Sequence, residues 1–257
     1  KIFTSGIPLN SEAFLDFDKN KFLVSEGLNA NLRTILISTN QSGEGEFSKI
    51  IKSIYEQFSD SIQIVAVCGS SQKNLKDLLE LKSKFGDKLN LKILGLIPNS
   101  ELMKYIKISD YYITKSGGFS ASEAFIMGKP TILLNHNAGY ENENASNFEK
   151  EKLAIVNNSI DDIGVQLKEL SDNNELLEEM RLAQTAFRNS YNIDQISEFA
   201  LKPKKNNHLD RLFVLGIEGG VKAEGTVEMI SKLDKISPSD VEIVLSYPQS
   251  FTGKYID

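Results

Sequence analysis

Residues 112–124 join an apolar stretch to a Gly-Gly turn and then to a segment that predicts a new helix. At such a turn the first backbone N–H groups of the helix have no partner within the helix, and the helix dipole adds partial positive charge. This kind of helix end binds phosphate groups well. The sequence therefore predicts a diphosphate site at this turn.

Charged and amide residues near the turn could complete such a site, but each also has an ordinary interpretation. Glu123 could be a ligand-binding carboxylate, or the last residue of a capping box that begins at Ser120 and stabilises the helix by about 1 kcal/mol. Tyr140 and the acidic and amide residues 141–143 could contact a ligand or form a solvated loop. Lys115 could neutralise phosphate or lie on the surface. The residue types alone leave these alternatives open.

Short apolar segments rich in β-branched residues alternate with segments of helical periodicity, which predicts an α/β fold with a parallel sheet and helices on both faces. The predicted strands are residues 34–38, 62–68, 91–95, 111–114 and 130–134, and two predicted helices are residues 47–58 and 75–85. Ligands of such sheets bind at the carboxyl ends of the strands. Glycine-bearing turns follow three of these strands, at residues 42–45, 68–69 and 116–118, and should meet at this edge.

The chain is expected to contain two parts. Residues 1–201 form the α/β domain, which ends in helices, and the polar residues 202–208 read as a linker. Residues 209–257 predict a small β-α-β unit of unknown role, with strands at 211–215 and 241–245 and a helix at 226–233. About 50 residues are few for an independent domain, so this unit could belong to a second domain.

Composition excludes several classes of function. The chain has 257 residues, a net charge of −6 with both signs interspersed, one cysteine and two histidines. A general nucleic-acid binder would carry a basic patch, and the usual zinc sites need more cysteine and histidine. No apolar run approaches the roughly 20 residues of a membrane helix, and no signal peptide is evident. We expect a cytoplasmic protein whose membrane contact is peripheral. Cys68 is expected to be a buried strand-end residue.

The order of these motifs resembles the C-terminal half of the lipid glycosyltransferases related to MurG, of the glycosyltransferase family 28 type. The residues that carry the resemblance are 6–8, 42–45, 67–69, 94–97, 101–103 and 109–118. Residues 6–8 (Gly-Ile-Pro) and 139–145 (Gly-Tyr-Glu-Asn-Glu-Asn-Ala) are most similar to the diacylglycerol glucosyl- and galactosyltransferases. The resemblance covers residues 1–200. It departs from the family at Tyr140, where relatives have glutamine, and at residues 38–43, where side chains replace a run of glycines.

The resemblance implies a two-domain GT-B architecture in which this chain supplies the Rossmann-like domain that binds a UDP-sugar. Backbone groups of Leu96 and Ile97 would contact uracil. Glu123 would bind the ribose, because the two oxygens of a carboxylate can accept both hydroxyl protons of a vicinal diol. The residues implied at the diphosphate are Ser116, Gly117, Gly118, Ser42 and Gly43. Those implied at the hexose are Tyr140, Glu141 and Asn144.

The family further implies transfer of a hexose to the hydroxyl of a lipid such as diacylglycerol, by direct displacement. UDP-sugar is then the donor substrate, and we expect no cofactor and no metal, because helix ends can carry the charge of the diphosphate. The catalytic base is expected in an N-terminal acceptor domain or partner chain, so no catalytic residue is assigned here. Two alternatives remain: a UDP-sugar epimerase or hydrolase of the same fold, and a non-catalytic module that binds nucleotide sugars.

Overall fold

The computed structural model describes residues 9, 11–134, 139–191, 211–216 and 241–246. The chain forms two compact units, Glu12–Phe187 and a second unit of Lys1–Ser11 with Arg188–Asp257. Every residue that the sequence predicts at the nucleotide-sugar site belongs to the unit Glu12–Phe187.

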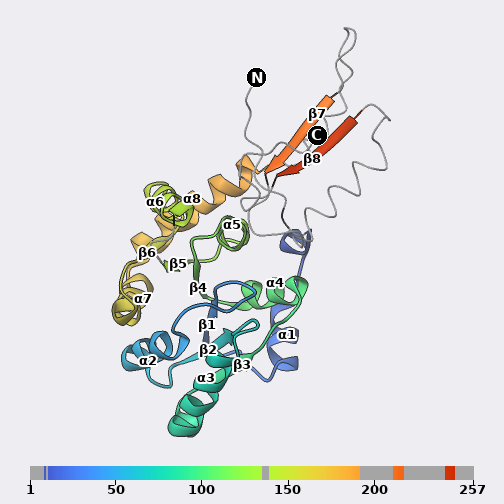
Figure 1. Cartoon of the computed structure of the whole chain (residues 1–257). Coiled ribbons are helices and arrows are strands. Elements are labelled where there is room, and N and C mark those ends of the chain that lie inside the picture. Colours follow the sequence, from blue (N-terminus) through green and yellow to red (C-terminus); the bar gives the residue numbers. More distant parts are fainter. Residues whose placement is uncertain (1–8, 10, 135–138, 192–210, 217–240, 247–257) are drawn as a thin grey trace. The chain divides into compact units, whose positions relative to one another are not determined.

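A parallel six-stranded sheet lies at the centre of this unit, in the order β3-β2-β1-β4-β5-β6 (Figure 1). The strands are β1 Arg33–Ser38, β2 Ile62–Val67, β3 Leu91–Leu94, β4 Tyr111–Lys115, β5 Thr131–Leu134 and β6 Ile155–Asn157. Strands β2, β4 and β5 are buried along their whole length, which explains their mostly apolar sequences. The predicted fold class and all five predicted strands are confirmed. The sequence pattern did not predict β6, which has only three residues.

Helices cover both faces of the sheet (Figure 1). They are η1 Ser11–Phe14, α1 Lys19–Ser25, α2 Phe47–Phe58, α3 Gln72–Phe85, η2 Gly86–Lys88, α4 Asn99–Ile108, α5 Gly118–Ile126, α6 Gly139–Lys150, η3 Ile160–Asp162, α7 Ile163–Asp172 and α8 Asn174–Ser190. The chain winds from β1 toward β3 and then from β4 toward β6 in the opposite direction. Because such crossovers are right-handed, the crossover helices α2 and α3 lie on one face and α5 and α6 on the other, whereas α7, which follows the last strand, packs against α2.

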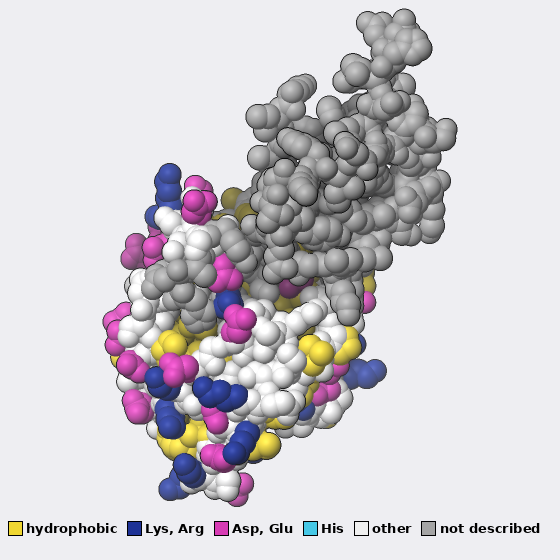
Figure 2. All heavy atoms as spheres, viewed as in Figure 1, with side chains coloured by type: hydrophobic (Ala, Val, Ile, Leu, Met, Phe, Trp, Pro, Cys, Tyr) yellow, Lys and Arg dark blue, Asp and Glu magenta, His cyan; other side chains and the backbone are white. Residues whose placement is uncertain are grey.

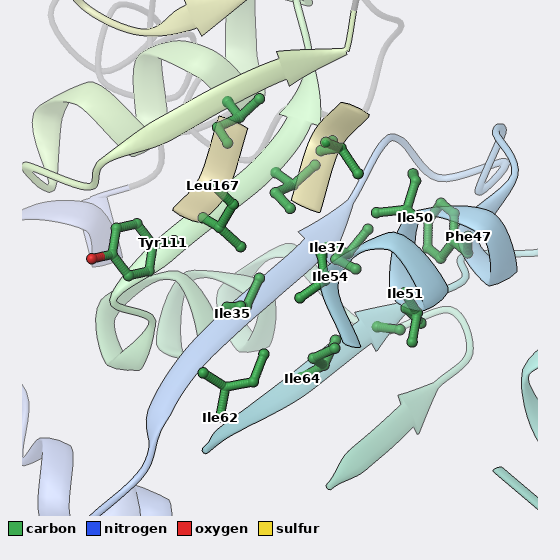
Figure 3. Close-up of a cluster of buried hydrophobic side chains, with 14 of the residues drawn as sticks. Ile35, Ile37, Phe47, Ile50, Ile51, Ile54, Ile62, Ile64, Tyr111 and Leu167 are labelled. Atoms are coloured by element: carbon green, nitrogen blue, oxygen red, sulfur yellow. The ribbon is translucent and has the colours of Figure 1, made fainter. Parts of the chain in front are cut away.

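Isoleucine side chains dominate the core on one face of the sheet (Figure 3). Ile35 and Ile37 of β1 are fully buried against side chains of α2 such as Ile50 and Ile54, and Leu167 of α7 joins the same cluster. Burial of one such side chain contributes about 1.5–3 kcal/mol. This packing fixes where α2 begins, and so where the turn between β1 and α2 must lie.

The strand order reverses between β1 and β4, which are neighbours in the sheet although two strands separate them in the chain. In open parallel sheets, ligands bind in the crevice at the carboxyl ends of the strands on either side of such a reversal. The turn after β1 contains Ser42 and Gly43, and the turn after β4 contains Ser116 and Gly117. The topology thus brings together two segments that the sequence predicts at a diphosphate.

The second unit contains two strands, β7 Arg211–Gly216 and β8 Val241–Ser246, which pair in parallel. Both strands were predicted and are confirmed. The predicted linker 202–208 and the predicted helix at 226–233 lie outside the described residues. The domain boundaries at residues 201 and 209 therefore stay predictions.

Helix α7 approaches α2 closely at Gly164. The Gly164 N–H donates to the Ser53 hydroxyl at 3.0 Å, and this hydroxyl donates to the carbonyl oxygen of Asp161 at 2.7 Å. An ideal Cβ at Gly164 would lie 2.0 Å from the carbonyl oxygen of Ser53. The contact between the two helices therefore needs a residue without a side chain.

Substitution of Gly164→Ala should lower the free energy of unfolding by about 1–3 kcal/mol, because the added methyl group forces α7 away from α2. Urea denaturation followed by circular dichroism measures this difference. Val165→Ala on the same helix, where the side chain is 44% exposed, is the control and should change the free energy by less than about 0.5 kcal/mol. An unfolding free energy of Gly164→Ala equal to that of the wild type would contradict the packing described.

Candidate nucleotide-sugar site

The turn between β4 and α5 is short and buried. Ser116 is fully buried, Gly117 is the N-cap residue of α5 with extended backbone (φ −69, ψ 146), and the helix starts at Gly118. The first N–H groups of α5 therefore point out of the carboxyl edge of the sheet without partners in the helix. The Ser116 hydroxyl is buried and has no hydrogen-bond partner among the described residues.

Glu123 lies one turn into α5 and is buried, with 4% of its surface exposed. The capping-box interpretation of this residue is wrong, because the helix starts at Gly118 and Ser120 is already its third residue. One oxygen of the carboxylate, Oε1, accepts a hydrogen bond of 3.3 Å from the side-chain amide of Asn99. A buried carboxylate is costly without such partners, so its retention here needs a reason other than helix capping.

Leu96 and Ile97 form the loop between β3 and α4. The Leu96 side chain is 63% exposed and that of Ile97 is half-buried. Pro98 follows with φ −58 and ψ 150, and Asn99 is the first residue of α4. The hydrogen bond from Asn99 to Glu123 thus brings the residues predicted at uracil next to the residue predicted at ribose.

Hydrogen bonds within the turn after β1 hold Ser42 and Gly43. The side-chain oxygen of Asn40 accepts hydrogen bonds from the Ser42 hydroxyl at 2.7 Å and from the Gly43 N–H at 2.8 Å. The side chains that replace a run of glycines here therefore bond to one another. The sequence alone could not decide between this arrangement and hydroxyls that face a ligand.

The turns after β1 and β2 interlock. Gly43 has φ +65, and an ideal Cβ there would lie 1.7 Å from the carbonyl oxygen of Cys68. Gly69 has φ +55, and its Cβ would lie 2.3 Å from the carbonyl oxygen of Gln41. Both positions therefore require glycine. Cys68 itself is fully buried, and burial raises the pKa of its thiol to about 11, which confirms that it is a buried strand-end residue.

Lys115, the last residue of β4, links three segments of the site. Its ammonium nitrogen lies 2.7 Å from Oε2 of Glu44, in the turn after β1, and 3.6 Å from Oε1 of Glu141 in α6. Burial opposes the charge of Lys115, but hydrogen bonds and attraction from Glu44 and Glu141 outweigh it and raise the pKa of Lys115. The hydrogen bond from Lys115 also lowers the pKa of Glu44. The surface-lysine interpretation is therefore wrong.

The residues predicted at the hexose, Tyr140, Glu141 and Asn144, all lie in the first half of α6. The solvated-loop interpretation of residues 140–143 is therefore wrong. The side-chain amide of Asn144 donates to the carbonyl oxygen of Ser116 at 3.1 Å, which joins α6 to the β4–α5 turn. Oε2 of Glu141 is buried and has no hydrogen-bond partner among the described residues.

Two residues of this region were not predicted. Asn99 and Glu44 both lie inside or next to the motifs that carried the resemblance, after residues 94–97 and within residues 42–45. Their positions beside these motifs could have indicated them. The sequence could not indicate their partners, Glu123 for Asn99 and Lys115 for Glu44, because these lie far away in the chain and only the fold brings them close.

A pocket of about 290 Å³ lies elsewhere on the carboxyl edge, between α2 and β6. Its described lining residues are Glu46, Lys49, Leu134, Asn157, Asn158, Ile160 and Asp161. None of the residues predicted at the nucleotide sugar is among them. The described lining of this pocket therefore does not include Glu123 or its partner Asn99.

The described residues contain no group of three or more His, Cys, Asp or Glu side chains placed to hold a metal ion. An Asp-x-Asp sequence occurs at Asp16 and Asp18, but Asp18 caps α1 by accepting from the Lys21 N–H at 3.0 Å. Within the same residues, no helix is long and apolar enough to cross a bilayer. Acidic and basic side chains are mixed over the described part of the face in Figure 2, without a basic patch there.

Substitution of Lys115→Met should lower the free energy of unfolding by about 3 kcal/mol or more, because Glu141 would keep a buried charge without a counter-charge. The side chains of Lys115 and Glu141 are only 11% and 10% exposed. Adding Glu141→Gln should recover at least half of the loss, which urea denaturation of the single and double variants measures. The control is Lys168→Met, which removes an exposed ion pair and should cost less than about 1 kcal/mol. Equal losses in Lys115→Met and the double variant would show that Glu141 does not depend on Lys115.

This chain is similar in sequence and in fold to known proteins. The curated processive diacylglycerol beta-glucosyltransferase of Bacillus pumilus is 32% identical over 179 residues, which are 69% of this chain and 45% of that protein. The chain thus spans about half the length of the curated relatives it matches. Two solved structures share the fold: WaaG, a glycosyltransferase involved in lipopolysaccharide biosynthesis, with a TM-score of 0.58, and the C-terminal CMP-Kdo binding domain of WaaA from Acinetobacter baumannii, with 0.53.

The coverage of these structures differs in an informative way. The WaaG match has 13% identity and covers 78% of this chain and 55% of WaaG, whereas the WaaA match has 10% identity and covers 66% of this chain and 95% of that domain. The fold of Glu12–Phe187 is therefore that of one Rossmann-like half of a GT-B enzyme. The family model for glycosyl transferases group 1 matches residues 19–186, most of this unit. The chain belongs to the glycosyl transferases group 1 family.

Proposed function

We propose that this chain is the donor-binding half of an enzyme that transfers a hexose from a UDP-sugar to a lipid hydroxyl, such as that of diacylglycerol, at a membrane surface. The curated relatives support the reaction, since they are named processive diacylglycerol beta-glucosyltransferases. The acceptor site and the catalytic base then belong to an N-terminal domain or a partner chain. The reaction is a direct displacement at the anomeric carbon, and UDP is the leaving group.

The observation that carries the proposal is the buried Glu123 carboxylate in α5, next to the reversal of strand order. Charged groups are rarely buried to 4% exposure, and a buried carboxylate at a ligand-binding edge of a sheet is a candidate for a functional site. A carboxylate has about four acceptor positions, so it can accept from Asn99 and from both ribose hydroxyls. Leu96 and Ile97 lie on the adjoining loop and would present their backbone groups to uracil.

The diphosphate would lie at the start of α5, where Ser116, Gly117 and Gly118 form the turn. Backbone N–H groups there are fixed donors for charge that develops on the leaving group. Ser42 and Gly43 contribute mainly shape, because the hydroxyl of Ser42 and the N–H of Gly43 already donate to Asn40. Lys115 supplies a positive charge between the two turns. These groups suit a diphosphate without a bound metal.

The hexose would extend from the diphosphate toward α6, where Tyr140, Glu141 and Asn144 lie. The hydrogen bond from Asn144 to the Ser116 carbonyl oxygen sets the distance between α6 and the turn. The buried Oε2 of Glu141 offers an acceptor to a sugar hydroxyl, because no described residue donates to it. The identity of the hexose depends on these three side chains.

Calorimetry tests the donor site directly. The wild-type chain should bind UDP, and Glu123→Gln should weaken binding by about 10- to 150-fold, since a hydrogen bond to a charged group contributes on the order of 1.5–3 kcal/mol. Glu80→Gln is the matched control, because Glu80 is an exposed carboxylate of α3, and its affinity for UDP should equal that of the wild type.

Two outcomes of this titration would count against the proposal. Absence of UDP binding by the wild-type chain would reject the donor site, and equal binding by Glu123→Gln would reject the role of Glu123. Titrations with UDP-glucose, UDP-galactose and UDP-N-acetylglucosamine then identify the preferred donor. Product analysis separates transfer to a lipid from epimerisation or hydrolysis of the same UDP-sugar.

A further inference from the structure

We propose that Asn99 is the positioning residue that orients the Glu123 carboxylate toward the ribose and so links recognition of the base to recognition of the sugar hydroxyls. The inference rests on the proposed function and assigns a residue that carries none of the predicted ligand contacts. Its basis is the hydrogen bond of 3.3 Å from the Asn99 side-chain amide to Oε1 of Glu123.

The side chain of Asn99 bonds to another helix, although asparagine at a helix start usually bonds to the backbone of its own helix. Asparagine is favoured as an N-cap residue because its side chain accepts from the first N–H groups of the helix. Here Pro98 is the N-cap residue, no side chain caps α4, and Asn99 is the first residue inside the helix. A carboxylate only accepts hydrogen bonds, so the NH₂ group of Asn99 faces Glu123.

A carboxylate at this position needs a fixed partner. The last torsion of a glutamate side chain is broad and roughly two-fold, so burial alone does not set the plane of the two oxygens. A vicinal diol is bound well only when both oxygens face its hydroxyls. A donor on Oε1 restricts this torsion before the nucleotide arrives, which lowers the entropic cost of binding.

Asn99 is itself fixed relative to the predicted base-binding loop. Proline restricts its own φ and also keeps the preceding residue, Ile97, extended. Only Pro98 separates Ile97 from Asn99, so the backbone groups proposed for uracil and the amide that holds Glu123 form one stiff segment. A shift of this loop would therefore move the carboxylate as well.

The test compares UDP with 2′,3′-dideoxy-UDP, which has the same base and diphosphate but no ribose hydroxyls. Calorimetry should show that the wild-type chain prefers UDP and that Asn99→Ala weakens UDP binding by about 5- to 10-fold while it changes dideoxy-UDP binding by less than about two-fold. The ratio of the two affinities should therefore fall toward the value for Glu123→Gln. A general disturbance of the loop would weaken both ligands alike and leave the ratio unchanged.

Two further variants complete the experiment. Ser100→Ala, at the next position of the same helical turn, should keep the wild-type ratio. Asn99→Asp has nearly the same shape but replaces the donor by an acceptor, so it should lower the ratio at least as far as Asn99→Ala. Thermal melting checks that each variant is folded.

Each other result has a distinct meaning. A wild-type chain that prefers UDP, together with unchanged ratios in both Asn99 variants, would overturn the role of Asn99 and leave the donor site intact. A wild-type chain that does not bind UDP would overturn the proposed function itself. A wild-type chain that binds UDP and dideoxy-UDP equally well would reject the ribose contact of Glu123, and the role of Asn99 with it.

Discussion

The carboxyl edge of the sheet depends on the close approach of two turns. The backbone at Gly43 lies so near the Cys68 carbonyl that a Cβ would be 1.7 Å from its oxygen, and Gly69 meets the Gln41 carbonyl in the same way. This mutual contact fixes the turn after β1 against the end of β2. The turn after β1 then places Glu44 beside Lys115. The reversal of strand order places Lys115 beside α5 and α6. Backbone contacts therefore fix these two turns against each other, and side-chain hydrogen bonds from Asn99 and Asn144 join the other segments of the site.

Much of this arrangement could be predicted from the sequence, because apolar segments and glycine turns report local structure directly. The helix 47–58 was predicted with the bounds of α2, and two of the three glycine turns, those after β1 and β2, meet as expected. The start of α5 was predicted less well: the Ser120 and Glu123 pair matches a capping box, but the Gly-Gly turn lets the helix begin at Gly118. Three-residue β6 gave too short a pattern to be recognised.

Pairings between distant residues were beyond the reach of the sequence. Lys115 could be judged neither buried nor exposed without knowing that Glu44 and Glu141 flank it. No role was assigned to Asn99 from the sequence, and the structure places its amide on Glu123. In both cases the strand order β3-β2-β1-β4 decides the neighbours, and no local periodicity encodes that order. The order of the motifs, through the resemblance to a family, implied which residues share a site, and periodicity could not.

Lys115 holds two carboxylates that differ sharply in exposure: the Glu44 side chain is 59% exposed and that of Glu141 only 10%. In the terms of coordination chemistry, Glu141 is the fixed ligand of this ammonium and Glu44 the labile one. A phosphate that reaches Lys115 would therefore bind by exchange for Glu44, whose carboxylate can pass into water at little cost. Lys115 would then exchange the Glu44 carboxylate for a phosphate, and its buried charge would have an anionic partner throughout.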